Sequence, residues 1–142
     1  MVAAKHNREA KRRPRRIPKV RVLENADTLQ FSFKHLDLTN QKYSVDSCCA
    51  VFWAALARKL CEYSTWTVDQ FSDQNHADHR HVIDFSETTE TGFWHLDTDQ
   101  LAYEEPWQFQ VGNEGWRIAG FILNGTFYIV WLDYNHALYA DR

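Results

Sequence analysis

The sequence lacks any run of about 18 apolar residues, the length that a helix needs to cross a membrane. We therefore expect no transmembrane helix and no membrane partner. The N-terminal segment is charged but has no apolar stretch behind it, so we expect no secretory signal. Only three cysteines are present, too few for a disulfide framework. These absences favour a cytoplasmic protein whose thiols stay reduced.

Charge is distributed unevenly along the chain. Nine of the 16 Lys and Arg residues, but only one of the 19 Asp and Glu residues, lie at positions 1–21. That segment has a formal charge of +8 and the remainder −11, although the net charge is only −3. Pro14 and Pro18 disfavour a helix in the basic segment, and its like charges repel one another. We therefore predict a flexible basic arm at residues 1–22 and a single domain at residues 23–142.

The basic arm has two interpretations that the sequence does not separate. One assigns it contacts with RNA phosphates, which give an affinity that falls with salt and ignores base sequence. In the other, the arm is a solubilising tail or folds back onto the acidic domain. The cations assigned to RNA binding in the first interpretation are Lys11, Arg12, Arg13, Arg15 and Arg16.

Three consecutive β-strands are predicted in the last third of the chain, at residues 107–111, 116–123 and 126–132. The segment Gly112-Asn113-Glu114-Gly115 forms a glycine-bounded turn between the first two strands. Asn124-Gly125 is a hairpin signal between the last two, because both residues tolerate the positive φ of a type I′ turn. The pattern predicts an antiparallel three-stranded meander.

The apolar pattern also predicts how this sheet is covered. The second and third strands are apolar at almost every position, which is typical of strands with both faces covered. In the first strand, Gln108 and Gln110 alternate with apolar residues, so we expect one buried and one solvent-exposed face there. We therefore expect helices from earlier in the chain to cover one face of the sheet.

The preceding segment predicts one strand and two helices. Residues 29–38 alternate between apolar and polar side chains, as a half-buried strand does. Ser44 is a candidate N-cap for a helix that runs to about Tyr63, with apolar residues at helical spacing. Thr67 and Gln70 have the spacing of a capping box and predict a second, short helix. The predicted fold is α+β: strand-helix-helix followed by the meander, with the helices packed on one face of the sheet.

A group of histidines raises the possibility of a metal site. His76, His79 and His81 lie close together in the sequence, and Asp78 or Asp84 offers a carboxylate oxygen. Their spacing is not one of the well-defined zinc patterns, however. We therefore expect solvated loop histidines, with no metal and no cofactor. A metal-assisted hydrolase is the alternative.

The C-terminal motifs resemble those of a known family. The middle strand of the meander begins with Gly115-Trp116-Arg117, and the hairpin after it is Asn124-Gly125. The last strand has the sequence FYIVWL. The polar segment 135–139 follows it and ends on Tyr139. Together with the order of the elements, these features resemble the RelE/ParE superfamily of small bacterial toxins. The ending is also similar to F-Y-x-V-W-L-D-x-x-H-x-L-Y, found in uncharacterised bacterial and phage proteins.

The resemblance implies an mRNA endoribonuclease, or mRNA interferase, of a toxin–antitoxin pair. Such an enzyme acts on the ribosome without a metal, by attack of a 2′-hydroxyl on the adjacent phosphate, and has an antitoxin protein as its partner. Arg117 would stabilise the charge that develops on the phosphate. A histidine side chain titrates near neutral pH, which suits His136 to act as acid or base. Tyr139 would stack on a base or relay a proton.

Two alternatives stay open. The chain is equally consistent with a non-catalytic protein- or nucleic-acid-binding module of the same fold, associated with a phage or a mobile element. The candidate residues also have structural interpretations. Arg117 would then pair with Asp133 across the hairpin, Asp133 and His136 would cap the turn after the last strand, and Tyr139 would pack on the helices.

Overall fold

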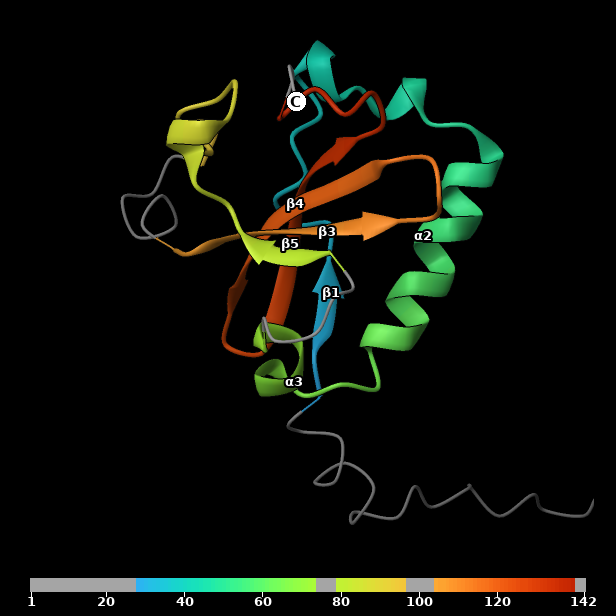
Figure 1. Ribbon diagram of the computed structural model, residues 1–142, viewed down its shortest axis with the longest axis vertical. Coiled ribbons are helices and arrows are strands. Elements are labelled where there is room, and N and C mark those ends of the chain that lie inside the picture. Colours follow the sequence, from blue (N-terminus) through green and yellow to red (C-terminus); the bar gives the residue numbers. More distant parts are fainter. Residues whose placement is uncertain (1–27, 74–78, 97–103, 140–142) are drawn as a thin grey trace, which may run out of the picture.

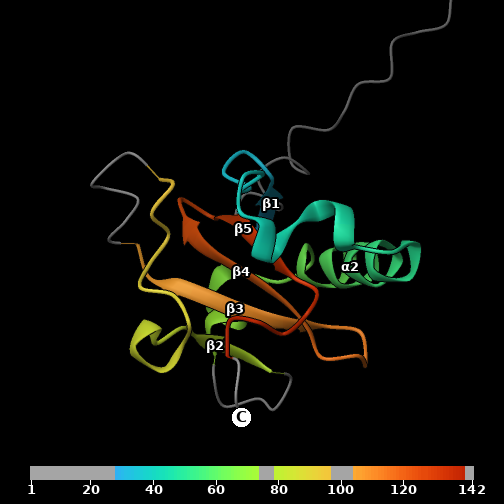
Figure 2. The same cartoon turned by 90° about the horizontal axis from the view of Figure 1, so that it is seen from above.

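The computed structural model describes residues 28–73, 79–96 and 104–139, which form an α+β fold around a five-stranded sheet. The strands are ordered β1-β5-β4-β3-β2, as their labels show in the second view (Figures 1 and 2). The predicted basic arm, with its five candidate RNA-binding cations, lies outside the described residues, as does His76. Within the described residues, no helix has the length and apolar character that a membrane span requires.

The predicted meander forms the centre of this sheet. Strands β3 (Pro106–Val111), β4 (Trp116–Leu123) and β5 (Thr126–Asp133) pair antiparallel in sequence order. Asn124 and Gly125 have φ values of 50° and 79°, as the predicted hairpin requires. The prediction was correct for these three strands but incomplete, because the sheet continues beyond them on both sides.

Short strands form the two edges of the sheet. Strand β1 (Gln30–Ser32) pairs parallel with β5, and β2 (Arg80–Val82) pairs antiparallel with β3. The predicted strand at residues 29–38 was too long. The chain turns directly after β1, because the Leu36 N–H donates to the Phe33 carbonyl at 3.0 Å.

The first helix begins later than the sequence indicated. Helix α2 spans Ala50–Tyr63, and the 3-10 turns η1 (Gln41–Tyr43) and η2 (Val45–Ser47) precede it. Ser44 caps η2 and not the long helix, since its hydroxyl accepts the Asp46 N–H within a three-residue turn. The predicted capping box is present: Thr67 and Gln70 exchange hydrogen bonds at the start of α3 (Val68–Ser72).

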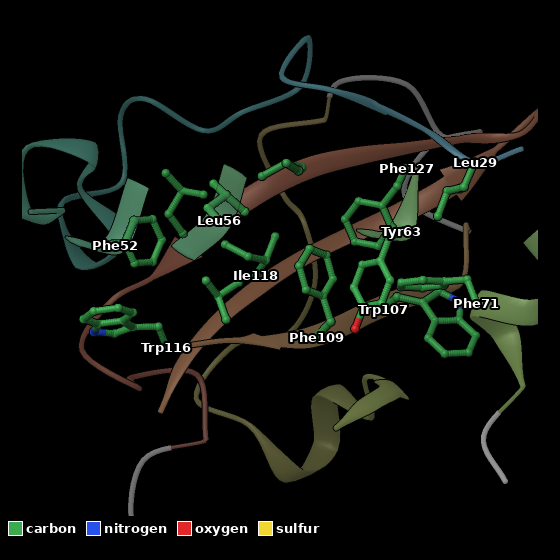
Figure 3. Packing of buried hydrophobic residues seen from close by; sticks show 13 residues of the cluster. Leu29, Phe52, Leu56, Tyr63, Phe71, Trp107, Phe109, Trp116, Ile118 and Phe127 are labelled. Atoms are coloured by element: carbon green, nitrogen blue, oxygen red, sulfur yellow. The ribbon is translucent and has the colours of Figure 1, made fainter. Parts of the chain in front are cut away.

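Two apolar clusters lie on opposite faces of the sheet, as expected from the alternation of side chains along a strand. Helix α2 runs alongside the sheet in both views (Figures 1 and 2). It contributes to the first cluster, whose aromatic rings converge in Figure 3. Buried members of this cluster include Phe52, Leu56, Tyr63, Phe71, Phe109, Ile118 and Phe127. The second cluster consists of Tyr43, Ile83, Phe93, Leu96, Ala119, Phe121, Val130, Trp131 and Leu138.

The second face corrects one prediction. Gln108 was expected on a solvent-exposed face but is only 1% exposed. This face is covered by irregular segments around η1, η3 (Phe85–Glu87) and the C-terminal residues, whose side chains form the second cluster. The alternating pattern correctly placed Gln108 on the sheet face opposite the first cluster. A polar side chain on a strand does not reveal, however, that loops cover this face.

A local irregularity shapes the same face. The pairing of β4 with β5 shifts register next to Gly120, which leaves Val130 as an extra residue in β5. A Cβ at Gly120 would overlap the carbonyl oxygen of Tyr128, so only glycine fits there. The Val130 carbonyl accepts the Asp37 N–H at 3.0 Å, which ties the loop after β1 to the sheet.

Candidate active site

An open pocket of about 390 Å³ lies on the sheet face opposite α2. It brings together all three catalytic candidates predicted from the sequence, with side chains from β2, β3, β4, η3 and the C-terminal segment. The lining residues are His81, Val82, Asp84, Glu87, Gln108, Arg117, His136 and Tyr139. The pocket is therefore the candidate active site.

Strand register explains how three of these side chains reach one face. His81 on β2 is paired with Gln108 on β3, which is paired in turn with Ala119 on β4. Arg117 lies two residues from Ala119 on the same strand. Because side chains alternate with a period of two, Arg117 shares a face with Ala119, Gln108 and His81. The sheet therefore holds three polar groups of the site on a hydrogen-bonded framework.

Asp133 holds the C-terminal segment that supplies His136 and Tyr139. Its carboxylate is 1% exposed and accepts the Ala137 N–H at 2.7 Å and the Leu138 N–H at 2.9 Å. Thr89 adds a second anchor, because its N–H donates to the Leu138 carbonyl at 2.8 Å. The structural interpretation of Asp133 as a cap is confirmed.

Arg117 presents a cation to this pocket. It lies opposite Asp133 in the strand register, yet the part of the chain that the structure describes contains no ion pair of Arg117. Its guanidinium instead donates to the neighbouring Trp116 carbonyl at 3.2 Å. Burial lowers the pKa of Arg117 and the charge of Asp133 raises it. A guanidinium nevertheless stays protonated in proteins, so the group can bind an anion.

His81 has a defined tautomer. Its Nδ1 lies 3.0 Å from the Val82 carbonyl oxygen. A carbonyl only accepts, so in this bond Nδ1 carries the proton, and Nε2 of the neutral ring is left as an acceptor. The ring also meets Tyr139 edge to face, with the centroids 5.7 Å apart. In its neutral form, His81 therefore has Nε2 as its acceptor nitrogen.

His136 has a backbone conformation that is uncommon for residues other than glycine. Its φ is 54°, in the left-handed region, and its side chain is exposed while lining the pocket. Outside glycine, this region is occupied mainly by Asn, Asp and His, and strained residues of this kind cluster at functional sites. Asn135 precedes His136, yet it is the histidine that adopts the strained conformation.

Gln108 forms the most buried polar group of the pocket. It is 1% exposed, and its Oε1 has no hydrogen-bond partner in the described part of the chain. Two acidic residues, Asp84 and Glu87, line the pocket beside it. Hydrogen bonds from Ser86 lower the pKa of Asp84, which keeps its carboxylate ionised.

The roles of His81 and Gln108 did not follow from the sequence. His81 was expected to be a solvated loop histidine, with a metal ligand as the alternative, but it lies half-buried in β2. Gln108 was expected to be solvent-exposed. The strand-like residues around His81 were the available signal, since pairing this strand with residues 107–111 places the two side chains together. Among the described residues, no group of three or more His, Cys, Asp or Glu side chains is arranged to hold a metal ion. The three-histidine hypothesis itself stays open, because it includes His76.

Comparison with protein-family models, curated proteins and solved structures gives no match. The resemblance to the RelE/ParE toxins therefore stays a prediction.

Proposed function

We propose that this chain is a toxin-like cytoplasmic endoribonuclease that cleaves mRNA without a metal. The observation that carries the proposal is that Arg117, His81, His136 and Tyr139 line a single open pocket. One cation and two imidazoles match the groups needed to cleave RNA by internal transesterification. The basic arm would hold the ribosome or RNA through its phosphates. An antitoxin protein is the partner that the resemblance implies.

The reaction requires two proton transfers and stabilisation of one developing charge. The 2′-oxygen forms a bond to phosphorus while the bond from phosphorus to the 5′-oxygen breaks. The products are a 2′,3′-cyclic phosphate and a free 5′-hydroxyl. A base takes the 2′-hydroxyl proton, and an acid gives a proton to the leaving oxygen. A fixed cation stabilises the charge that grows on the phosphate oxygens.

The contacts of each side chain favour one assignment of roles. His81 is the base, because its Nδ1–H is donated to the Val82 carbonyl and its Nε2 is left to accept a proton. His136, on the anchored C-terminal segment, is the acid in its protonated form. Arg117 binds the phosphate through its planar pair of N–H donors. Tyr139 stacks on a base next to the cleaved bond.

The negative charge of the domain and of the pocket favours a second function, that of a binding module. Residues 22–142 have a formal charge of −11, and Asp84 and Glu87 lie in the pocket itself. A domain with this net charge repels a polyanion such as RNA. This observation favours the non-catalytic binding module, in which the same pocket binds a ligand without cleaving it.

Expression in a bacterium separates the two functions. We expect the wild-type chain to arrest growth, and Arg117→Ala, His81→Ala and His136→Ala each to relieve the arrest. In a translation extract, each substitution should slow mRNA cleavage about 100-fold or more. The cleaved ends should be a cyclic phosphate and a 5′-hydroxyl.

Arg58→Ala is the matched control, because Arg58 is an exposed arginine on α2 that does not line this pocket. Circular dichroism confirms that each variant is folded. A harmless wild type, or folded variants that stay as toxic as Arg58→Ala, would rule out the ribonuclease.

A further inference from the structure

We infer that Gln108 is a second phosphate-binding residue of the pocket, whose side-chain N–H donates to a phosphate oxygen beside Arg117. The inference rests on the proposed function for its ligand, an RNA phosphate. It goes beyond that function because it gives the phosphate a second donor, from a neutral residue that no charge pattern in the sequence indicates. It is carried by the orientation of one buried amide.

The side-chain amide of Gln108 turns its donor toward the pocket. Its Oε1 is buried and has no hydrogen-bond partner within the described residues, which leaves Nε2 as the accessible atom of an amide that lines the pocket. Turning the amide by 180° would bury two N–H donors in place of one oxygen, which costs more free energy. The observed orientation is therefore the favoured one, and it presents N–H groups to a ligand.

Arg117 lies diagonally next to Gln108 on the same face of the sheet. In the register of β3 with β4, Gln108 is paired with Ala119, which is two residues along β4 from Arg117. Diagonal neighbours are about 7 Å apart, and both side chains are long enough to converge on one group between them. One phosphate oxygen can accept from the guanidinium while another accepts from the amide. The two residues therefore form a donor pair for a tetrahedral oxyanion.

This donor pair and the carboxylates occupy different sides of the pocket. Asp84 and Glu87 follow β2, and β3 lies between β2 and β4. The carboxylates repel a phosphate, so an anion is favoured on the side of β3 and β4, where the guanidinium supplies charge. A phosphate held there lies next to His81, the proposed base, because His81 is paired with Gln108 in the register.

The experiment compares adenosine 3′-phosphate with adenosine, which lacks the phosphate. In calorimetric titration of the full chain, two hydrogen bonds to a charged group should favour adenosine 3′-phosphate about 100-fold. Gln108→Met keeps the length of the side chain but removes its donor, and should reduce this preference to about tenfold.

Gln110→Met is the matched control and should keep the full preference. Gln110 is on the same strand and face, but it does not line this pocket. Its Nε2 already donates to the Gly112 carbonyl at 3.1 Å.

The melting temperature separates phosphate binding from a structural role of Gln108. Gln108→Met removes a buried acceptor that has no partner, so the variant should melt at a higher temperature than the wild type. A residue that serves only the fold gives the opposite result, which is a lower melting temperature with an unchanged preference for the phosphate. That result overturns the inference.

A measurement on the wild type protects the test against misfolding of the variant. In proton–nitrogen NMR spectra, the side-chain amide signals of Gln108 should shift on saturation with adenosine 3′-phosphate but not with the same concentration of adenosine. Signals that do not move overturn the inference. Equal affinities of the wild type for the two ligands also overturn it, as does a full preference in folded Gln108→Met.

Both measurements detect binding without cleavage, so the two proposals fail separately. A phosphate site that depends on Gln108, in a chain that cleaves no RNA, contradicts only the ribonuclease. Cleavage of RNA by a chain whose phosphate affinity does not depend on Gln108 contradicts only the inference.

Discussion

At the residue scale, His136 combines a strained backbone with a place in the pocket. A side chain with a Cβ is disfavoured in the left-handed region by roughly 1–2 kcal/mol, whereas glycine enters it freely. With φ at 54°, His136 therefore lowers the stability of the fold. Under the proposed function the imidazole acts in the pocket while the backbone of the same residue costs stability, so the two effects can be measured separately.

His136→Gly therefore separates stability from activity. We expect the free energy of unfolding to rise by about 1 kcal/mol, because the strain is relieved. RNA cleavage should be lost, because the imidazole is gone. Denaturant titration and the cleavage assay measure the two quantities on one preparation. A variant that is less stable than the wild type would show that His136 has a structural role.

At the element scale, the C-terminal segment depends on one buried carboxylate. Each Asp133 oxygen accepts a different backbone N–H, so the carboxylate fixes the turn that carries His136 and Tyr139. Residues 134–139, the described part of the chain after β5, contain no helix or strand and are held by this cap and by Thr89. Asp133 does not line the pocket, but a conservative substitution of it should therefore displace His136 and Tyr139, which do.

Asp133→Asn tests this dependence. The amide presents an NH₂ group to one of the two N–H donors, so one charge-assisted hydrogen bond is lost and two donors face each other. We expect a loss of about 3 kcal/mol in the free energy of unfolding, together with weaker cleavage. Asp69→Asn, on the exposed side of α3, is the control and should change little. Equal stabilities of the two variants would show that Asp133 does not anchor the segment.

At the scale of the whole molecule, Asp37 joins segments that are far apart in the sequence. Its Oδ1 accepts from Thr39 and Asn40, and its Oδ2 accepts from the Trp131 indole at 3.3 Å. His95 Nδ1 lies 3.7 Å from the same oxygen. Burial raises the pKa of Asp37, but the hydrogen bonds from Thr39 and Trp131 and the charge of His95 outweigh burial and lower it overall.

This shift predicts how acid acts on the fold. Because the pKa of Asp37 is lower when folded, its carboxylate stabilises the protein above the ordinary value of 3.8. That contribution is lost as the pH falls below about 4 toward the folded pKa. Asp37→Asn should be less stable than the wild type at neutral pH, and the difference should shrink in acid. Thermal unfolding at several pH values measures it, and a constant difference would contradict the prediction.

Local patterns in the sequence determined the turns, the three central strands and the short helix. Asn124-Gly125 and the Thr67–Gln70 capping box act within a few residues. The hairpin turn and the helix start that they form therefore need no contact with distant segments. The catalytic candidates Arg117, His136 and Tyr139 were also found from the sequence, through the family resemblance. Ser44 shows the limit of such reasoning, because a capping residue does not reveal whether a single turn or a long helix follows.

Only the tertiary structure decided what depends on pairing between distant segments. The parallel pairing of β1 with β5, and the place of β2 beside β3, bring together residues that are far apart in the chain. This pairing puts His81 next to Gln108, and the loops over that face bury Gln108. Burial depends on which segments cover a side chain, and a period of two along one strand contains no information about them. The composition of the pocket therefore became visible only in three dimensions.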